Sequence, residues 1–568
     1  MADQGALPAF ETTGYYRYPQ LSTLIHDWAR QRPTLARCYS LGRTLESREI
    51  WCVEITNTAT GLAEDKPAYY IDANIHAGEV TGSSVALYTI HHLLTEYGAD
   101  PFVTRLLDDF AFYIVPRIAM DGAELYLTTP ELLRSSVRAY PPDLEVEGIE
   151  RRDLDGDGWA VQMRVPDRTG GWKISERDPR AMVRRAPDEY GAEYFRLYPE
   201  GLITDFQGVE VKVAPSRLGL DVNRNFPANW APEGVQSGAG PYPLSEPESR
   251  AVAEFMLSHR NIAGAQHYHT QSAVILRPFS GKPDSALPKR DLEAYELIGR
   301  LGTEATGWPV VSTFHGFTDD PDAPRAGIHL DWTYEHLGIL VFSTELWSAA
   351  KAAGLEVGHY ARFWRELDEE QQLRLLAWND AELGGAGFVD WHPFDHPQLG
   401  PVEIGGWKVK YVFQNPPPGR YLAELCRANC RFTLRAAASS PRLRLPEVQV
   451  TPLDAGLYRV RAVVENEGFL PTNVTEQAIK LKVARPVRVE LFPSVGAELV
   501  GGQRRQEIGH LAGRIEQARV HLLWGSVGNG ARRAVEWLVR ATAPDAVVTV
   551  RATCDRAGHV SRQVPLPS

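Results

Sequence analysis

The chain has 568 residues, of which 43% are hydrophobic and 23% are charged. This usage is typical of globular proteins, and the length exceeds what one hydrophobic core supports, so at least two domains are expected. The formal charge of -12 argues against a nucleic-acid-binding protein, which needs a basic patch, and favours peptides or small molecules as partners.

The first 30 residues lack the cationic start and the apolar core of a secretory signal. No apolar run of about 18 residues follows, so no membrane association is expected. We therefore expect a cytoplasmic protein, or a secreted one if a leader has been removed. The five cysteines are few and odd in number, which predicts free thiols rather than a disulfide framework.

Apolar stretches of strand length then alternate with helical patterns. Residues 68–75, AYYIDANI, are predicted to form a buried strand. Residues 81–98 are predicted to form a helix, because apolar residues recur at helical spacing and Gly98 can end it. Further strands are predicted at 110–115, 263–268, 273–278 and 338–346. This alternation predicts an α/β sheet covered by helices.

The pattern changes after the proline cluster at 415–420. The stretches that follow are short, rich in β-branched residues and separated by turn residues, as in an antiparallel sandwich. The sequence therefore predicts an α/β domain over 1–420, followed by an all-β sandwich over 421–568.

A histidine and a glutamate stand three residues apart where the first predicted strand ends, in DANIHAGE. His76 and Glu79 can both reach one ion, and a catalytic zinc usually takes three protein ligands. The third ligand is expected in GAQHYHTQSAVILRP, where His269 lies at a turn between two strands and His267 precedes it by two positions. Taken alone, the spacing of His76 and Glu79 is a weak signal.

Two further stretches carry polar residues that could take part in a functional site. Asn223 and Arg224, in GLDVNRNFPANW, could hold a free carboxylate, or they could belong to an ordinary surface loop. Glu345 sits late in the apolar run GILVFSTEL. A carboxylate there is costly to bury unless it is paired or used in catalysis.

Together, HAGE, DVNRNFP, HTQSAVILRP and DWTY with FSTEL resemble the zinc metallocarboxypeptidase family, the carboxypeptidase A-like enzymes, in that family's chain order. The resemblance covers residues 15–400. It implies a mixed eight-stranded sheet flanked by helices, interrupted here by an insertion around 143–215. It also implies one Zn²⁺ per chain, held by His76, Glu79 and His269, and a peptide substrate whose terminal carboxylate binds Asn223 and Arg224.

The resemblance also implies a mechanism. Zinc would activate a water molecule, and Glu345 would act as its general base and then deliver the proton to the leaving amine. A cation should stabilise the oxyanion. Arg164 is predicted for this role, although Arg180, Arg184 and Arg185 lie in the same insertion.

The chain departs from the family in positions that bear on the substrate. Gly78 stands where an arginine usually precedes the glutamate, and Ala323 stands where the family's substrate-capping tyrosine would fall. Leu330 would line the base of the side-chain pocket. An aliphatic residue there implies a preference for apolar or aromatic C-terminal residues.

The insertion contains Asp153, Asp155 and Asp157 in a D-x-D-x-D-G run, which is like the start of a calcium loop. An EF-hand needs a glutamate at the twelfth position, where this chain has Arg164. A solvated acidic turn is therefore the alternative to a Ca²⁺ site.

Two other functions remain open. One is a zinc amidohydrolase acting on cell-wall peptides or small amides, which would use the same zinc and glutamate. The other is a non-catalytic peptide-binding relative, which would keep Asn223 and Arg224 but would gain nothing from Glu345. A serine hydrolase and a thermolysin-like enzyme are disfavoured, because neither G-x-S-x-G nor H-E-x-x-H occurs.

Overall fold

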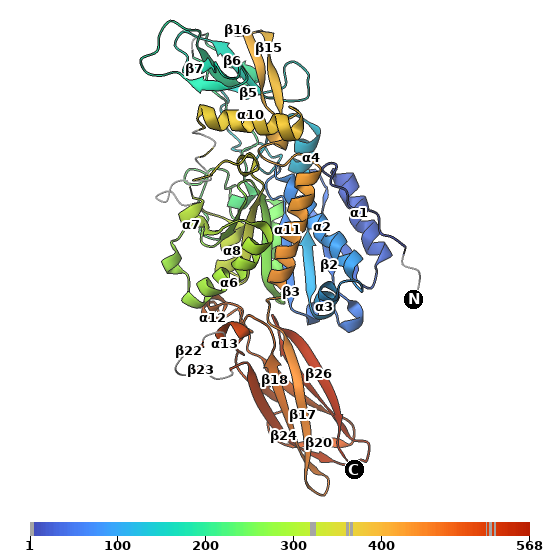
Figure 1. The fold of residues 1–568 in the computed structure, drawn as a ribbon. Coiled ribbons are helices and arrows are strands. Elements are labelled where there is room, and N and C mark those ends of the chain that lie inside the picture. The colour runs from blue at the N-terminus through green and yellow to red at the C-terminus, as the bar shows by residue number, and fades with distance from the viewer. Residues whose placement is uncertain are drawn as a thin grey trace.

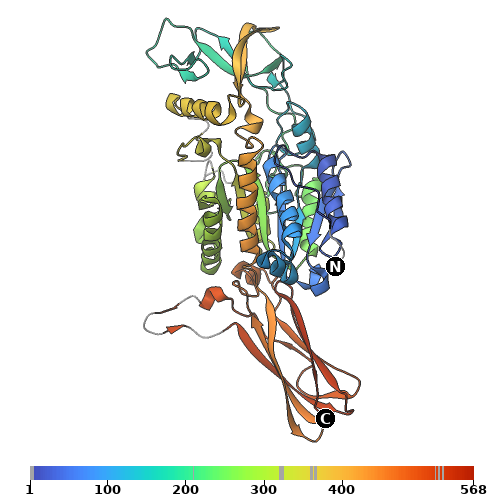
Figure 2. The ribbon, with the colours of Figure 1, turned by 45° about the vertical axis from the view of Figure 1, so that its right-hand side comes forward.

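Three parts follow one another along an elongated molecule in the computed structural model (Figure 1). A small sheet domain lies at one end, an α/β domain in the middle and a β-sandwich at the other end, and Figure 2 shows the same order from a second side. The structure describes residues 5–208, 210–318, 325–358, 363, 367–517, 520–521, 525–526 and 530–567. Within these ranges, no helix is long and apolar enough to cross a bilayer.

The α/β domain is built on one mixed sheet of eight strands in the order β1-β2-β4-β3-β11-β14-β12-β13. The four central strands β4, β3, β11 and β14 are parallel to one another, and both flanks contain antiparallel pairs. This sheet confirms the predicted fold class. The strands are β1 (Ala36–Arg43), β2 (Glu49–Ile55), β3 (Ala68–Ala73), β4 (Ala111–Val115), β11 (Ile262–Thr270), β12 (Val274–Arg277), β13 (Val310–Ser312) and β14 (Leu340–Leu346).

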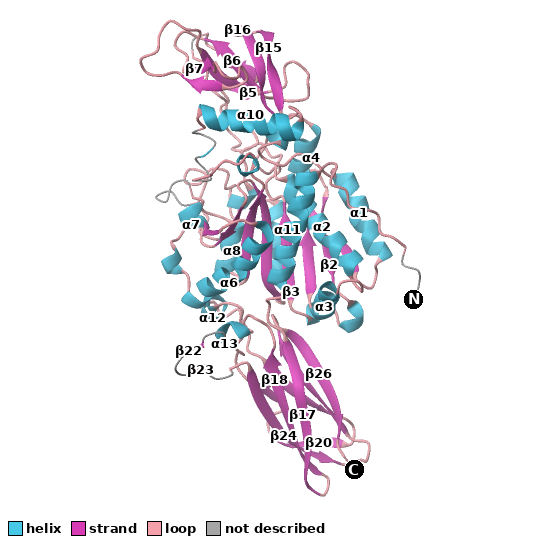
Figure 3. Ribbon diagram, viewed as in Figure 1, coloured by secondary structure: helices cyan, strands magenta, loops and turns pink. Residues whose placement is uncertain are grey.

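Helices cover the sheet, as Figure 3 shows in cyan. α2, α6 and α11 pack side by side on it, and α1 and α5 contact its β1 edge. The helices of this domain are α1 (Tyr18–Gln31), α2 (Val80–Glu96), α3 (Pro101–Asp109), α4 (Met120–Thr128), α5 (Pro247–Ser258), α6 (Lys289–Thr306), α7 (Thr313–Gly316), α8 (His329–Glu335), α9 (Ala349–Ala352), α10 (Glu369–Leu383) and α11 (Arg420–Ala437).

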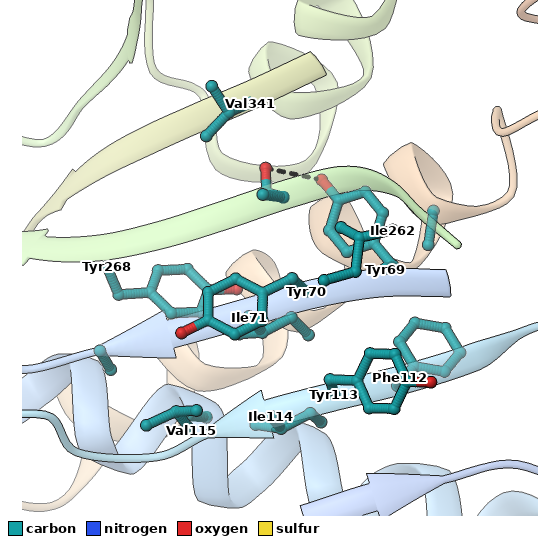
Figure 4. Close-up of a cluster of buried hydrophobic side chains, with 14 of the residues drawn as sticks. Tyr69, Tyr70, Ile71, Phe112, Tyr113, Ile114, Val115, Ile262, Tyr268 and Val341 are labelled. Carbon is teal, nitrogen blue, oxygen red and sulfur yellow. Dashed lines mark hydrogen bonds between the residues drawn. The ribbon is translucent and has the colours of Figure 1, made fainter. Parts of the chain in front are cut away.

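The core lies between the central strands and these helices (Figure 4). Every residue of β3 is buried, as expected for a strand covered on both faces. The Tyr69 ring lies against Gly264 of the neighbouring strand, where a Cβ atom would come within 2.5 Å of the ring. The Tyr69 hydroxyl donates to the Ala265 carbonyl at 3.2 Å. Aromatic packing and one hydrogen bond thus fix β3 against β11.

The insertion is larger than the sequence indicated. Its six-stranded antiparallel sheet has the order β15-β16-β6-β9-β7-β8, so two of its strands come from a segment far beyond residue 215. The strands are β6 (Gln162–Pro166), β7 (Trp172–Ile174), β8 (Met182–Arg184), β9 (Phe195–Pro199), β15 (Phe388–His396) and β16 (Gly400–Trp407), and a separate pair is β5 (Gly148–Arg151) with β10 (Gly201–Thr204).

The sandwich begins at Leu443, later than the predicted boundary at residue 420. The reason is that α11 packs against α2 and α6 and belongs to the α/β core. One sheet contains β17 (Leu443–Asp454), β18 (Leu457–Asn466), β24 (Arg532–Ala541) and β20 (Ala497–Gly501), and the other contains β21 (Arg505–Glu507), β19 (Arg488–Pro493), β25 (Val547–Cys554) and β26 (Gly558–Pro565). Shorter elements are α12 (Glu476–Lys480), α13 (Arg514–Gln517), β22 (Val520–His521) and β23 (Gly525–Ser526).

Buried polar contacts join the sandwich to the α/β domain. The Arg556 guanidinium is 7% exposed and donates to the carbonyls of Leu337 and Gly338, just before β14. The Asp291 carboxylate of α6 accepts the backbone N–H groups of Glu476 and Gln477. Arg556 thus contacts the backbone just before β14, the strand that carries Glu345.

Candidate active site

The predicted metal ligands meet at the carboxyl edge of the parallel strands. His76 and Glu79 follow β3, and His269 lies near the end of the adjacent strand β11. His76 Nδ1 lies 2.8 Å from Glu79 Oε1, and His269 Nδ1 lies 3.0 Å from Glu79 Oε2. All three residues are buried.

The donor atoms fit a zinc ion. The Nδ1 atoms of His76 and His269 lie 3.1 Å apart. Two nitrogen ligands of a tetrahedral zinc, each at about 2.0–2.1 Å, would be separated by about 3.3 Å. The two imidazoles and one carboxylate are also the donor set of many catalytic zinc sites, in which the fourth position takes water.

His267 does not join this group. Its Nδ1 lies 2.9 Å from Asp72 Oδ1, and its ring lies over His329, with 4.0 Å between centroids. His329 in turn stacks on Phe226 at 4.3 Å. Ligand atoms of Asp72, His267 and His329 do lie within 4.8 Å of one another. His267 thus contacts Asp72 and His329 and not the His76, Glu79 and His269 group.

Asp221 links the metal ligands to the predicted substrate-binding residues. Its Oδ1 lies 3.3 Å from His76 Nε2 and accepts the Asn223 N–H at 2.9 Å. Its Oδ2 accepts the Arg134 Nε–H at 2.9 Å. Although burial opposes it, the charges of Arg134, Arg224 and His76 hold the pKa of Asp221 well below its ordinary value. A charged Asp221 can orient the His76 ring, as the carboxylates that accept hydrogen bonds from zinc-binding histidines do.

Asn223 and Arg224 line the same cavity, of about 300 Å³, as the three metal ligands and Glu345. The Asn223 side-chain oxygen accepts the His329 N–H at 2.9 Å. Burial lowers the pKa of Arg224 to about 10, so the guanidinium remains charged at neutral pH. A buried cation facing a cavity favours an anionic ligand.

Glu345 lies on β14, paired in register with His269 on β11. Burial and the neighbouring Glu79 carboxylate raise the pKa of Glu345 well above its ordinary value. A divalent cation between the ligands would offset this shift, because it adds positive charge beside both carboxylates. Glu345 is therefore an ionisable group that lines the cavity beside the three metal ligands.

These features agree with the comparison with known families. The model of the zinc carboxypeptidase family matches residues 21–364, more than half of the chain. The chain belongs to the zinc carboxypeptidase family. A second model, described as a domain of unknown function, matches residues 442–565, which form the sandwich.

Individual members of the zinc carboxypeptidase family are distant relatives. Carboxypeptidase A6 of Mus musculus is 22% identical over 340 residues, which are 58% of this chain and 60% of that protein. Carboxypeptidase A2 of Rattus norvegicus is 23% identical over 342 residues, which are 58% of this chain and 61% of that protein. The chain thus spans about 60% of the length of these relatives.

Solved structures with a similar fold are also distant in sequence. Carboxypeptidase A from Helicoverpa armigera aligns with a TM-score of 0.41 and 16% identity, over 68% of this chain and 76% of that one. Bovine thrombin-activatable fibrinolysis inhibitor, solved with tick carboxypeptidase inhibitor, aligns with a TM-score of 0.42 and 17% identity, over 75% of this chain and 97% of that one.

The prediction that Arg164 stabilises the oxyanion is wrong, because Arg164 does not line this cavity. It lies on β6 in the insertion, where its Nε donates to Glu403 at 2.6 Å and its guanidinium packs on Trp391. Arg134 lines the cavity instead, where it lies 3.5 Å from Glu79 and bonds to Asp221. Arg134 precedes the insertion, and the sequence prediction placed the arginine beyond the insertion's start.

The predicted calcium ligands cap their own turn. Asp153 accepts the N–H groups of Gly156 and Gly158, and Asp157 accepts that of Trp159. His392 Nε2 lies 3.0 Å from Asp155. The buried Glu200 completes an acidic group with Asp153 and Asp155. These contacts agree with the acidic turn and give Ca²⁺ binding no support.

Leu330, Gly78 and Ala323 are the positions that the sequence connected with substrate choice. Leu330 is 4% exposed and lines the cavity. A Cβ atom at Gly78 would come within 2.3 Å of the Gln414 side chain, so Gln414 occupies the space beside this position. Ala323 lies outside the described residues.

Proposed function

We propose that the chain is a zinc-dependent carboxypeptidase that removes the C-terminal residue of peptides. One observation carries this proposal: Glu345, the three metal ligands and the buried Arg224 line a single cavity. A binding protein could use Arg224 alone. A buried glutamate beside the ligand set adds nothing to peptide binding but is what hydrolysis needs.

The proposed roles follow from these positions. When bound by His76, Glu79 and His269, zinc would supply Lewis-acid chemistry and lower the pKa of water. Glu345 would accept the proton of the attacking water and return it to the leaving amine.

Arg224 and Asn223 would hold the terminal carboxylate and so place the last peptide bond next to Glu345. Arg134 would face the oxyanion, in place of Arg164.

The expected preference for apolar or aromatic C-terminal residues rests on Leu330. Leu276, Phe317 and Ile328 add apolar surface to the same cavity. Arg325 and several hydroxyl groups also line it, so apolar lining describes only part of the pocket.

Paired peptides test the proposal. The zinc-loaded protein is incubated with each peptide as free acid and as C-terminal amide, and loss of single residues is followed by mass spectrometry. We expect trimming of the free acids only, and its disappearance with a chelator. Cleavage of the amides at equal rate, or no cleavage with zinc bound, would contradict a carboxypeptidase.

A further inference from the structure

The cavity contains one arginine beyond those with a proposed role in peptide cleavage. Three arginines line it, Arg134, Arg224 and Arg325, together with the carboxylates of Glu79 and Glu345. Arg134 is bonded to Asp221, and Arg224 is proposed to bind the terminal carboxylate. Arg325 has no role in that scheme.

The backbone that follows Arg325 is hydrogen-bonded to the segment that carries Arg224. The Phe226 N–H donates to the Gly327 carbonyl at 3.0 Å, and the Gly327 N–H donates to the Ala228 carbonyl at 2.9 Å. The Ala326 N–H donates to Gln236 Oε1 at 3.0 Å. Gly327 has a φ of +69°, and a Cβ atom there would come within 2.0 Å of the Arg224 carbonyl oxygen. Arg325 is therefore held close to the site of the terminal carboxylate.

The charge of Arg325 acts on Arg224 and on Glu345. It contributes to lowering the pKa of Arg224, and it opposes the raised pKa of Glu345. Two guanidinium groups that repel each other in one cavity are stabilised by a ligand that brings negative charge to both. A peptide ending in an uncharged residue brings one carboxylate, whereas a peptide ending in an acidic residue brings two.

The rest of the pocket suits such a residue. Leu276 and Leu330 can contact the methylene groups of an acidic side chain. The hydroxyl group of Ser343 lines the same cavity and can donate to a carboxylate, whereas the Thr313 hydroxyl donates to the Arg277 carbonyl.

Building on the proposed carboxypeptidase activity, we propose that Arg325 is a specificity-determining residue that binds the side-chain carboxylate of a C-terminal glutamate or aspartate. Peptides with an acidic last residue would then be preferred over the apolar or aromatic last residues that Leu330 alone suggests. Arg325 would form a charge-assisted contact with the side chain, while Arg224 holds the terminal carboxylate.

Isosteric peptide pairs test this inference. We compare kcat/KM of the zinc-loaded protein for peptides that differ only in a last residue of Glu, Gln, Leu, Phe or Lys. We expect Glu to exceed Gln by about 10- to 100-fold, because a hydrogen bond to a charged group is worth that factor. Arg325→Met should lower kcat/KM for Glu by the same factor and leave Gln and Leu within about threefold. Arg325→Glu should favour Lys over Glu.

Two outcomes overturn the inference without touching the proposed function. One is hydrolysis in which Leu or Gln equals Glu. The other is an equal loss for all peptides in Arg325→Met, which would assign Arg325 to the terminal carboxylate. Calorimetry with the zinc-loaded Glu345→Gln variant measures the affinity of the pocket for the Glu and Gln peptides without hydrolysis. Equal affinity there overturns the inference even if no peptide is cleaved, whereas absence of cleavage alone contradicts the proposed function.

Discussion

His269 and Glu345 are register partners on the adjacent parallel strands β11 and β14. One is a proposed metal ligand and the other is the proposed general base. Because both belong to the central sheet, their separation is set by strand pairing and not by a loop. The sheet therefore positions the base relative to the metal before any substrate binds.

Replacing the base should separate catalysis from metal binding. We expect Glu345→Gln to lower kcat by roughly 10²- to 10⁴-fold, the range for loss of a general base. Zinc content, measured by elemental analysis, should stay near that of the wild type, because Glu345 is not a ligand. Activity within a factor of ten of the wild type would remove Glu345 from its proposed role.

His269 and His267 form a matched pair for the metal site. His269→Gln removes a ligand, so the purified protein should lose bound zinc and the rise in Tm that zinc gives the wild type. His267→Gln keeps all three ligands and should retain zinc at one ion per chain. Loss of zinc in the His267 variant alone would place the metal at the Asp72 group instead.

Arg134 and Arg164 can be distinguished in the same way. Arg134→Met should lower kcat by about 10²- to 10³-fold, as loss of an oxyanion donor does. Arg164→Met should leave kcat within about threefold and lower stability by about 1–2 kcal/mol, because Glu403 loses its partner and Trp391 its cation. Zinc content is measured for both variants, so that a loss of metal is not read as a loss of catalysis.

Glu200 predicts a pH dependence of stability. Burial and the nearby Asp155 and Asp153 carboxylates raise its pKa to about 7. Between the ordinary glutamate pKa and this value, the folded state binds the proton that the unfolded state has released, so stability falls as pH rises through that window. We expect this loss to be about 1–2 kcal/mol and Glu200→Gln to remove it.

Urea unfolding between pH 4 and pH 8 measures this slope. Glutamine also changes the contacts of Glu200, but that change is the same at every pH, so the slope is the readout. Adding millimolar calcium provides the control for the acidic turn. A wild-type slope that disappears with calcium and not with magnesium would show that the loop binds calcium after all.

The sequence could predict the sheet and the metal ligands because both leave local signals. Strand β3 begins with the apolar run AYYI, HAGE and FSTEL are short motifs at strand ends, and DVNRNFP is a short loop motif. Arg134 carried no comparable signal, since its role depends on a contact with Asp221 across the fold. The domain boundary was misjudged because the proline cluster precedes α11, and only packing against α2 and α6 shows that α11 belongs to the first domain.

The six-stranded sheet of the insertion includes β16, which pairs with β6. Much of the α/β domain lies between these two strands in the sequence. The insertion therefore cannot be removed as one continuous loop. Cutting out only the first segment would leave the β15–β16 hairpin with an open edge, which invites pairing with another molecule. A minimal version of the α/β domain must delete both segments, and a transplant of the small sheet to another protein needs two junctions rather than one.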